Sequence, residues 1–342
     1  MNQRLQEKKP EHPRRGRRRA LARTINTLPI YVLLALLFIA YFAFQQSPSL
    51  SIIFGAALFF TIIILLILEV TNGAREEGTV KNAMEIAVAI ILVVVLWFGM
   101  RAVLNTTYPL DVVPSCSMLP VLNRGDMIVL QGANQSSLNA PIINVNGTQW
   151  NASFANLSKE ALQCVAYSKV GGRVSVSQLV RPGYSVGLLR TNGVTGLIVP
   201  YNYQQNNTVK YICGTANVLF QNGTMGQEAY TTGIVVGNTT IRGDRNNSII
   251  VYQTIPQDAF YKDGDSYIVH RVYAIVNASG RFYVLTKGDN NPGLDVQYQN
   301  YPIAMSYVGG KTIASLPYVG YLKLILSNNF AEPAGCNSTV VS

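Results

Sequence analysis

Three long apolar runs lie close together near the start of the chain. They cover Leu28 to Phe44, Leu50 to Leu68 and Ile86 to Leu104, the last broken only by Arg101 near its end. As α-helices rising about 1.5 Å per residue, all three come near the roughly 30 Å of a bilayer core. None has the polar stripe of a helix that covers a soluble core. The pattern predicts three transmembrane helices.

The rest of the chain consists of short β-branched or alternating stretches, which are typical of β-strands. Clusters of Gly, Asn and Pro separate them. The clearest stretches are Met127 to Leu130, Gly183 to Leu189, Ser248 to Gln253, Tyr267 to Ile275 and Phe282 to Thr286. We therefore expect a mainly β region from about residue 105 onward.

Positive charge is concentrated at the N-terminus. The chain has a formal net charge of +10, and residues 1–25 supply nine Lys or Arg against two Glu, a net of +7. A basic arm in front of an apolar run sets membrane orientation, so no nucleic-acid partner is expected. The charged fraction of 13% and the mean hydropathy of +0.20 also favour a membrane protein.

Lys and Arg around the apolar runs predict the topology. The basic arm and the second connection, with Arg75 and Lys81, belong in the cytoplasm, whereas residues 45–49 carry no charge and belong outside. Three crossings then place the chain from about residue 105 outside the cell. The expected location is the plasma membrane, as a multi-pass protein with a cytoplasmic N-terminus.

Asn-x-Ser/Thr sequons agree with this topology, because none precedes residue 105. An Asn- and Ser-rich chain also produces sequons by chance, but chance does not account for so sharp a boundary. The glycosylation candidates are Asn105, Asn134, Asn146, Asn151, Asn156, Asn206, Asn222, Asn238, Asn246, Asn277 and Asn337.

Four cysteines lie in the region expected outside, where disulfides form and persist. They are Cys116, Cys164, Cys213 and Cys336. Cys164 and Cys213 fall in one loop-rich section and form the expected disulfide pair. With no CxxC spacing and two histidines in the chain, no metal site is expected, and no Gly-rich phosphate loop or other cofactor site is recognised.

A serine, a histidine and an aspartate of the outer region could form a hydrolytic site. Ser117 would need a positioned base to attack a carbonyl. His270 is the available base, because the other histidine, His12, lies in the basic arm. A strand histidine taken alone is more often structural than catalytic. Asp295 or Asp289 could orient its imidazole.

Four segments of the outer region resemble, in the same order, the motifs of a known family. They are Pro114 to Pro120 followed closely by Asn123 to Leu130, then Val269 to Val272, Thr286 to Asn291 with Asp295, and Leu316 to Leu322. The family is the type I signal peptidases, and the resemblance is closest to the archaeal and endoplasmic-reticulum branch, in which histidine replaces the bacterial lysine base. It covers about residues 85–130 and 248–326, but not 131–247.

The resemblance implies a role for each candidate residue. Ser117 would be the nucleophile, His270 the general base and Asp295 the orienting acid, with Asp289 in support. The backbone N–H of Ser117 and the hydroxyl of Ser115 would form the oxyanion hole.

The resemblance also implies that substrate binds as an added strand between Asp111 to Pro114 and Tyr267 to Val269, with shallow pockets for small side chains. The substrate-binding residues would be Val113, Pro114, Met118, Ile268 and Val269. The chain departs from the family at Cys116, where glycine is usual. That side chain could crowd the turn or join another cysteine, and the preferred interpretation is a tolerated small apolar substitution.

The expected architecture is membrane-anchored, with three N-terminal transmembrane α-helices and a mainly β extracytoplasmic domain of the signal-peptidase type that carries a large β-rich insertion. The expected parts are a basic cytoplasmic arm (1–27), a membrane domain (28–104), a catalytic domain (105–130 and 248–326), a glycosylation-prone insertion (131–247) and a C-terminal tail (327–342).

The expected function is that of a membrane-bound serine endopeptidase that cleaves signal peptides from secreted preproteins. Membrane lipid and the protein translocation machinery are further candidate partners. Two alternatives stay open. One is a non-catalytic surface glycoprotein with a degenerate site, for which Cys116 is the main argument. The other is a related protease dedicated to one pre-protein, for which the insertion would supply docking.

Overall fold

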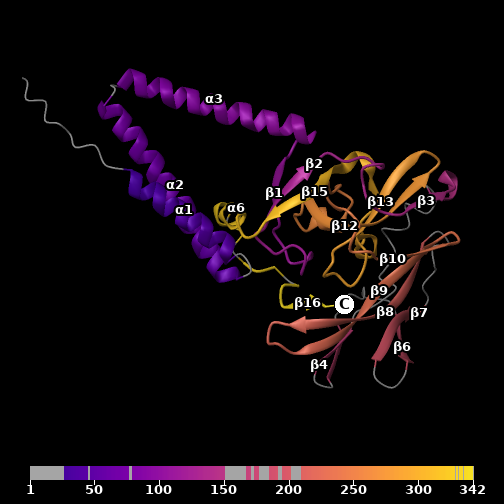
Figure 1. Cartoon of the computed structure of the whole chain (residues 1–342). Coiled ribbons are helices and arrows are strands. Elements are labelled where there is room, and N and C mark those ends of the chain that lie inside the picture. The colour runs from indigo at the N-terminus through magenta and orange to yellow at the C-terminus, as the bar shows by residue number, and fades with distance from the viewer. Residues whose placement is uncertain are drawn as a thin grey trace, which may run out of the picture.

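A computed structural model describes most of the chain. The described residues are 27–44, 47–76, 79–150, the strand segments 167–170, 173–176, 185–191 and 195–201, and 209–341 apart from 328, 330 and 334. Helices extend from one side of a body made of β-sheets (Figure 1). The basic arm and His12 lie outside the described residues.

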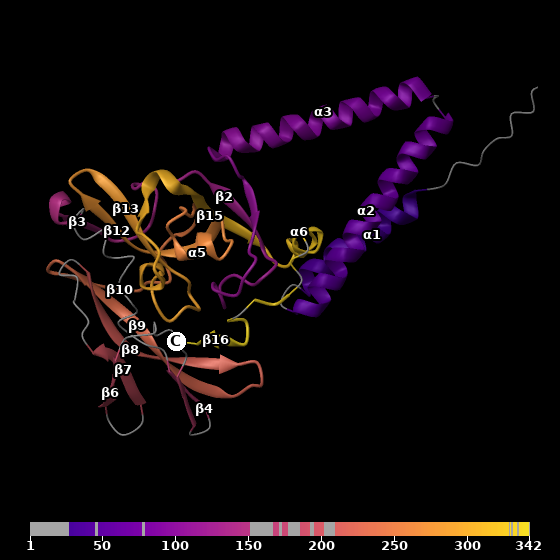
Figure 2. The same ribbon diagram turned by 180° about the vertical axis from the view of Figure 1, so that it is seen from behind.

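The apolar runs form three helices, α1 (Leu28–Ala43), α2 (Pro48–Glu76) and α3 (Thr79–Leu104). α1 lies along α2, and α3 diverges from both (Figures 1 and 2). Among the described residues, two helices are long and apolar enough to cross a membrane, in the windows Ile52–Asn72, which is 11% buried, and Ile86–Leu104, which is 0% buried.

The first predicted span differs from the other two. α1 has 16 residues, or about 24 Å of helix, which is short of a bilayer core of about 30 Å. Near its end, the Tyr41 hydroxyl donates a hydrogen bond to the backbone carbonyl of Pro317 in the β body. α1 is therefore a shorter apolar helix that also contacts the β body.

An eight-stranded sheet carries most of the region that resembles the family. Its order is β1-β2-β15-β11-β12-β13-β14, and β3 pairs with β12 off this path. The strands are β1 (Leu110–Val112), β2 (Met127–Gln131), β3 (Ile142–Val145), β11 (Ile249–Gln253), β12 (Tyr267–Ala278), β13 (Arg281–Lys287), β14 (Ile303–Ala304) and β15 (Val308–Leu316).

Neighbouring strands of this sheet are antiparallel, except that β3 runs parallel to β12. Short helices lie between and after them: α5 (Ala259–Lys262), η1 (Asp295–Tyr298), η2 (Met305–Tyr307) and α6 (Tyr321–Leu326).

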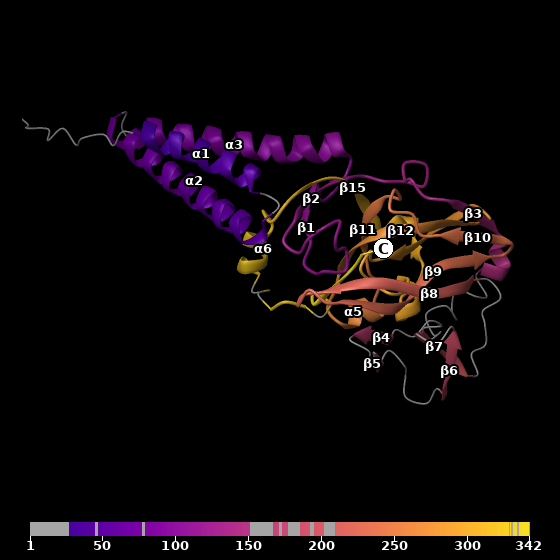
Figure 3. The same ribbon diagram turned by 60° about the horizontal axis from the view of Figure 1, so that its bottom comes forward.

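A second sheet is built mostly from residues 131–247. Its order is β16-β8-β9-β4-β5, with β10 paired to β9, and β6 and β7 form a separate hairpin. The strands are β4 (Tyr167–Val170), β5 (Arg173–Val176), β6 (Ser185–Thr191), β7 (Thr195–Tyr201), β8 (Val209–Phe220), β9 (Met225–Val236), β10 (Thr239–Arg242) and β16 (Ser338–Val340). β16 belongs to the predicted C-terminal tail, so that tail contributes an edge strand to the insertion sheet. The long strands β8 and β9 lie side by side in this sheet (Figure 3).

The expectation of a mainly β region is confirmed. The five strands expected from the sequence correspond to β2, β6, β11, β12 and β13, and none differs at an end by more than three residues. β12 is the clearest case, because every residue from Val269 to Val276 is buried. A strand covered on both faces reads in the sequence as a continuous apolar run.

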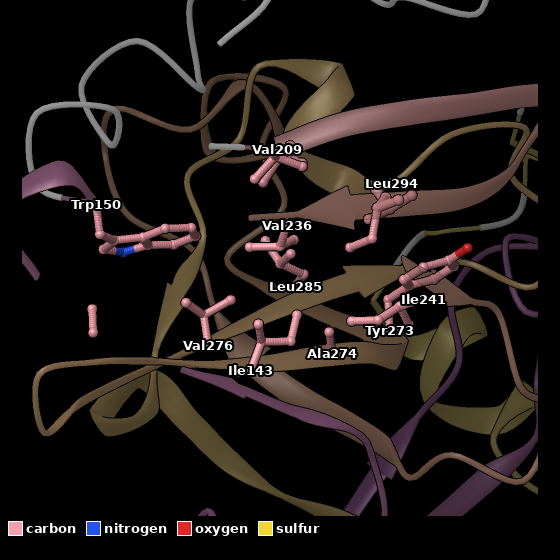
Figure 4. Close-up of a cluster of buried hydrophobic side chains, with 13 residues drawn as sticks. Ile143, Trp150, Val209, Val236, Ile241, Tyr273, Ala274, Val276, Leu285 and Leu294 are labelled. Atoms are coloured by element: carbon pink, nitrogen blue, oxygen red, sulfur yellow. The ribbon is translucent and has the colours of Figure 1, made fainter. Parts of the chain in front are cut away.

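The insertion packs against the first sheet through a common hydrophobic core (Figure 4). Val209 and Val236 of the insertion meet Tyr273 and Leu285 of β12 and β13 there, and Trp150 lies in the same cluster. Trp150 is fully buried and its ring lies 5.7 Å from that of Tyr283.

Replacing Trp150 tests this core. Trp150→Ala should lower the free energy of unfolding by about 3 to 5 kcal/mol, because the cavity left by a buried indole closes only in part. Thermal unfolding of the detergent-solubilised protein would measure the change. Tyr261→Ala is the matched control, since that ring is 44% exposed. An equal effect in both variants would contradict a shared core.

Candidate functional site

The segment that follows β1 forms a tight turn around Ser117. Met118 is fully buried beneath the turn and packs in a cluster with Val113 and Leu122, which anchors the segment to the sheet. The backbone carbonyl of Ser117 accepts a hydrogen bond of 2.8 Å from the N–H of Asn290. A side chain at Gly288 would come within 2.7 Å of that carbonyl, so glycine permits this close approach.

His270 lies on β12 directly against this turn. Its Nε2 is 3.0 Å from the Ser117 Oγ, although 153 residues separate the two in the sequence. The imidazole is 3% exposed. The ring of Phe260 in α5 meets it edge-on, with centroids 6.0 Å apart. The imidazole is therefore held on one side by an aromatic ring and faces the serine hydroxyl with one nitrogen.

Asp295 holds the other nitrogen of the imidazole. Both of its carboxylate oxygens lie 2.8 Å from His270 Nδ1. The hydroxyls of Tyr252 and Thr286 donate further hydrogen bonds to Oδ2, at 2.8 and 2.5 Å. A carboxylate in this position favours the tautomer with its proton on Nδ1, which leaves the lone pair of Nε2 directed at Ser117.

Two opposing effects act on the Asp295 carboxyl. Its burial alone would raise its pKa, whereas the charge and hydrogen bond of His270, together with the Thr286 and Tyr252 hydroxyls, lower it. The net result is a pKa of Asp295 below the usual range. The carboxylate therefore stays charged at neutral pH despite its burial.

Asp289 does not contact the imidazole. It forms a bidentate ion pair with Arg271, whose Nε lies 2.8 Å from Oδ1 and whose Nη2 lies 2.7 Å from Oδ2 of the carboxylate. Arg271 also donates to the backbone carbonyls of Arg245 and Asn247. Of the two aspartates that the sequence leaves open as partners of His270, the structure brings Asp295 to it.

An open groove of about 210 Å³ lies beside Ser117 and His270. Four of the expected substrate-binding residues line it, namely Val113, Pro114, Ile268 and Val269. Met118 does not, because its side chain fills the core under the turn. The Ser115 hydroxyl also faces the groove and lies 3.2 Å from the Ser117 Oγ.

Cys116 forms a disulfide with Cys336. The interpretation of Cys116 as a tolerated apolar substitution is therefore wrong, because its sulfur is bonded to the C-terminal segment. Both cysteines are buried, at 6% and 7% exposure. Cys164 lies outside the described residues, so its pairing with Cys213 stays a prediction.

Most of the described sequon asparagines are exposed, and Asn277 is half-buried, with its amide on the Asn144 side chain. The exposed ones are Asn105, Asn134, Asn146, Asn222, Asn238, Asn246 and Asn337. Asn151, Asn156 and Asn206 lie outside the described residues. Glycosylation of any of them stays a prediction.

Several residues that hold the site together carried no signal in the sequence. Tyr252 reads as an ordinary strand residue, and Phe260 lies outside every motif. Thr286 begins the segment that includes Asp289 and could have been found there. Its hydroxyl donates to Asp295, whereas its neighbour Lys287 lies against Tyr230 of the insertion.

Lys287 lines a second cavity, of about 340 Å³, between the insertion and the first sheet. Its Nζ lies 3.8 Å from the ring centroid of Tyr230 and 3.2 Å from the backbone carbonyl of Gly288. Burial lowers the pKa of Lys287 to about 7, with help from Arg245 and against the opposing charges of Asp289 and Asp295.

Two proteins whose names state a function are similar to part of this chain. The signal peptidase complex catalytic subunit SEC11 of Verticillium alfalfae is 36% identical over 72 residues, which are 20% of this chain and 41% of that protein. The subunit of the same name from Colletotrichum graminicola is 38% identical over 64 residues, 18% of this chain and 37% of that protein.

This chain thus spans about two fifths of the length of the relatives it matches. No family model matches the chain, and no solved structure matches it. The partial similarity relates the chain to signal peptidases at the level of a peptidase hydrolase.

The buried Lys287 generates a pH prediction. The unfolded chain keeps this proton up to about pH 10.4, whereas the folded protein releases it near pH 7. Between these values unfolding takes up a proton, so this residue makes the free energy of unfolding rise with pH, by up to about 1.4 kcal/mol per unit. Lys287→Met should remove that part of the slope. Denaturation at pH 6, 7, 8 and 9 would measure it, and an unchanged slope would contradict the burial argument.

Proposed function

We propose that this protein is a membrane-anchored serine endopeptidase that removes signal peptides from exported preproteins. The observation that carries the proposal is the contact chain from Ser117 Oγ through His270 to the buried carboxylate of Asp295. The partial similarity to two signal peptidase catalytic subunits supports the substrate class.

In this proposal His270 takes the proton of the Ser117 hydroxyl as the oxygen attacks the peptide carbonyl, and later gives that proton to the leaving amine. Asp295 stabilises the imidazolium formed between these steps. Its lowered pKa suits this role, because the carboxylate remains charged throughout. Tyr252 and Thr286 fix the carboxylate by hydrogen bonds, so the imidazole keeps its orientation.

The tetrahedral intermediate would be stabilised by the backbone N–H of Ser117 and the hydroxyl of Ser115. Ser115 suits this role because its hydroxyl faces the groove next to the nucleophile. Donors aimed at the oxyanion are among the largest contributions to acyl transfer, since removing one costs about 100 to 1,000-fold in rate.

The proposed substrate binds as an extended strand between β1 and the start of β12. Among the described residues, Leu110 to Val112 pair with β2 on one side, and Tyr267 to His270 pair with β11 on one side. The free edges offer backbone groups to an added strand. The small groove between them suits the short side chains of an Ala-x-Ala cleavage site.

The position of the site near α3 fits this substrate. Ser117 follows the end of α3 at Leu104 by about thirteen residues, so the nucleophile would lie near the membrane surface, where a translocated signal peptide presents its cleavage site. We infer that α1 crosses the membrane as α2 and α3 do. The β region then faces the outside of the plasma membrane, and the translocation machinery is a neighbour.

Cleavage of a preprotein tests the nucleophile and the base. The purified full-length protein in detergent should cleave a preprotein with an Ala-x-Ala site, whereas Ser117→Ala and His270→Ala should lower kcat by at least about 1,000-fold, since each leaves the attack without activation. Ser306→Ala, at an exposed serine of η2, should retain wild-type activity. Equal cleavage by all four proteins would contradict this mechanism.

A second test separates the two aspartates. Asp295→Asn should lower kcat by about 1,000 to 10,000-fold, because the amide stabilises the wrong tautomer of the imidazole. Asp244→Asn is a control of equal charge change at an exposed position and should leave kcat unchanged. Steady-state kinetics on the same preprotein would measure both. An Asp295→Asn enzyme within threefold of wild type would assign the orienting role elsewhere.

A further inference from the structure

The C-terminal segment after α6 returns to the turn that carries Ser117. Its first attachment runs through Arg124, which is 9% exposed. The guanidinium donates to the backbone carbonyl of Pro114 at 3.0 Å, and to those of Asn329 and Ala331 at 2.7 and 3.1 Å. One side chain thus ties the start of the turn to the C-terminal segment.

Asn290 forms a second attachment on the other side of the turn. Its side-chain NH₂ lies 3.1 Å from the carbonyl of Cys116 and 3.2 and 2.9 Å from those of Gly335 and Ser338. Its side-chain oxygen accepts from the N–H of Val340 at 2.8 Å. Asn290 therefore joins the C-terminal segment to the residue between the two serines.

The disulfide between Cys116 and Cys336 is the third attachment and the covalent one. Ser115 and Ser117 flank Cys116, so the backbone position of Cys116 sets the position of both serines. Fixing this one residue therefore fixes the proposed nucleophile together with the proposed oxyanion donor.

The far side of the C-terminal segment is anchored to the insertion. β16 pairs with the end of β8. The Gln221 side chain donates to the carbonyl of Cys336 at 3.1 Å, and the N–H of Val341 to that of Asn217 at 2.9 Å. The segment consequently connects the turn that carries Ser117, called the nucleophile turn below, to a sheet outside the region that resembles the family.

We propose that this C-terminal segment, consisting of Asn329, Ala331 and residues 335–340 and called the strap below, positions the nucleophile turn and is required for full catalytic rate. Cys116 and Cys336 are then positioning residues, together with Arg124 and Asn290. The inference rests on the proposed peptidase function. Its physical reason is that a misplacement of reacting atoms by about 1 Å can cost about 100-fold in rate.

Removing the disulfide tests the strap. Cys116→Gly combined with Cys336→Ser should lower kcat for preprotein cleavage at least about tenfold, with KM within about twofold of wild type. The matched control is Cys164→Ser combined with Cys213→Ser, which changes the other two cysteines of the chain and should retain kcat and KM. A disulfide-free variant with wild-type kcat and only a lower Tm would overturn the proposal, because the strap would then serve stability alone.

Reduction of the disulfide gives a reversible version of the same test. Dithiothreitol transfers two electrons and two protons to the bond, yielding the Cys116 and Cys336 thiols and the cyclic disulfide of the reagent. In the Cys164→Ser, Cys213→Ser protein, kcat should fall on reduction and return on reoxidation. The Cys116→Gly, Cys336→Ser variant should not respond. The proposal would be overturned if the first protein kept its full activity after complete reduction. Thiol alkylation would verify that the reduction is complete.

Asn290→Asp provides a variant that keeps the disulfide. The carboxylate retains an oxygen for the N–H of Val340 but loses the donor to Cys116, Gly335 and Ser338, so kcat should again fall more than KM changes. Wild-type kcat in this variant and in the disulfide-free one would refute positioning. Failure of the wild-type protein to cleave any preprotein would instead refute the proposed function, and the two failures are therefore distinguishable.

Discussion

The carboxylate of Asp295, the first residue of η1, is buried against the first sheet, and an isolated charge at such a depth would cost several kcal/mol. Its partners come from three adjacent strands, because Tyr252 lies on β11, His270 on β12 and Thr286 on β13. The hydrogen bonds that compensate one charge thus link three adjacent strands. The same hydrogen bonds that make the burial tolerable also orient the imidazole toward Ser117, so stability and the proposed chemistry depend on one group.

The segment that holds Asp295 is itself supported from the insertion. Thr231 of β9 donates its N–H to the carbonyl of Pro292 at 2.7 Å, and its hydroxyl to the Gln297 side chain at 3.0 Å. Gln297 in turn accepts the N–H of Leu294 at 2.7 Å. The insertion therefore supports the segment of Asp295, while the strap contacts the turn that carries Ser117. Residues 131–247 and 327–342 are both outside the family resemblance, yet both contact the segments that form the candidate site.

The sequence predicted those parts of the molecule whose physics is local. β12 follows from one run rich in β-branched residues, and α2 and α3 follow from hydropathy over a sufficient length. Asp295 lies 25 residues from His270 in the sequence, and only the resemblance to the family assigned it as the partner of the imidazole. The residues taken alone left Asp289 equally open as that partner. The ion pair of Asp289 with Arg271 could not be predicted, because both residues sit in motifs that read as catalytic. The role of Tyr252 could not be predicted, because a tyrosine on a strand is common and only the structure shows its hydrogen bond to Asp295.

The disulfide of Cys116 went unpredicted for a different reason. Its partner lies 220 residues away, and pairing of four cysteines cannot be read from spacing alone. The resemblance even argued against it, since glycine is usual at this position. A glycine allows close backbone approach at the cost of chain entropy, and here a bonded cysteine replaces that freedom with a covalent constraint. Such a bond persists in an oxidising compartment. The disulfide beside the proposed nucleophile therefore agrees with the outside location that the charge distribution predicts for the β region, and it weakens the interpretation of Cys116 as a sign of a degenerate site.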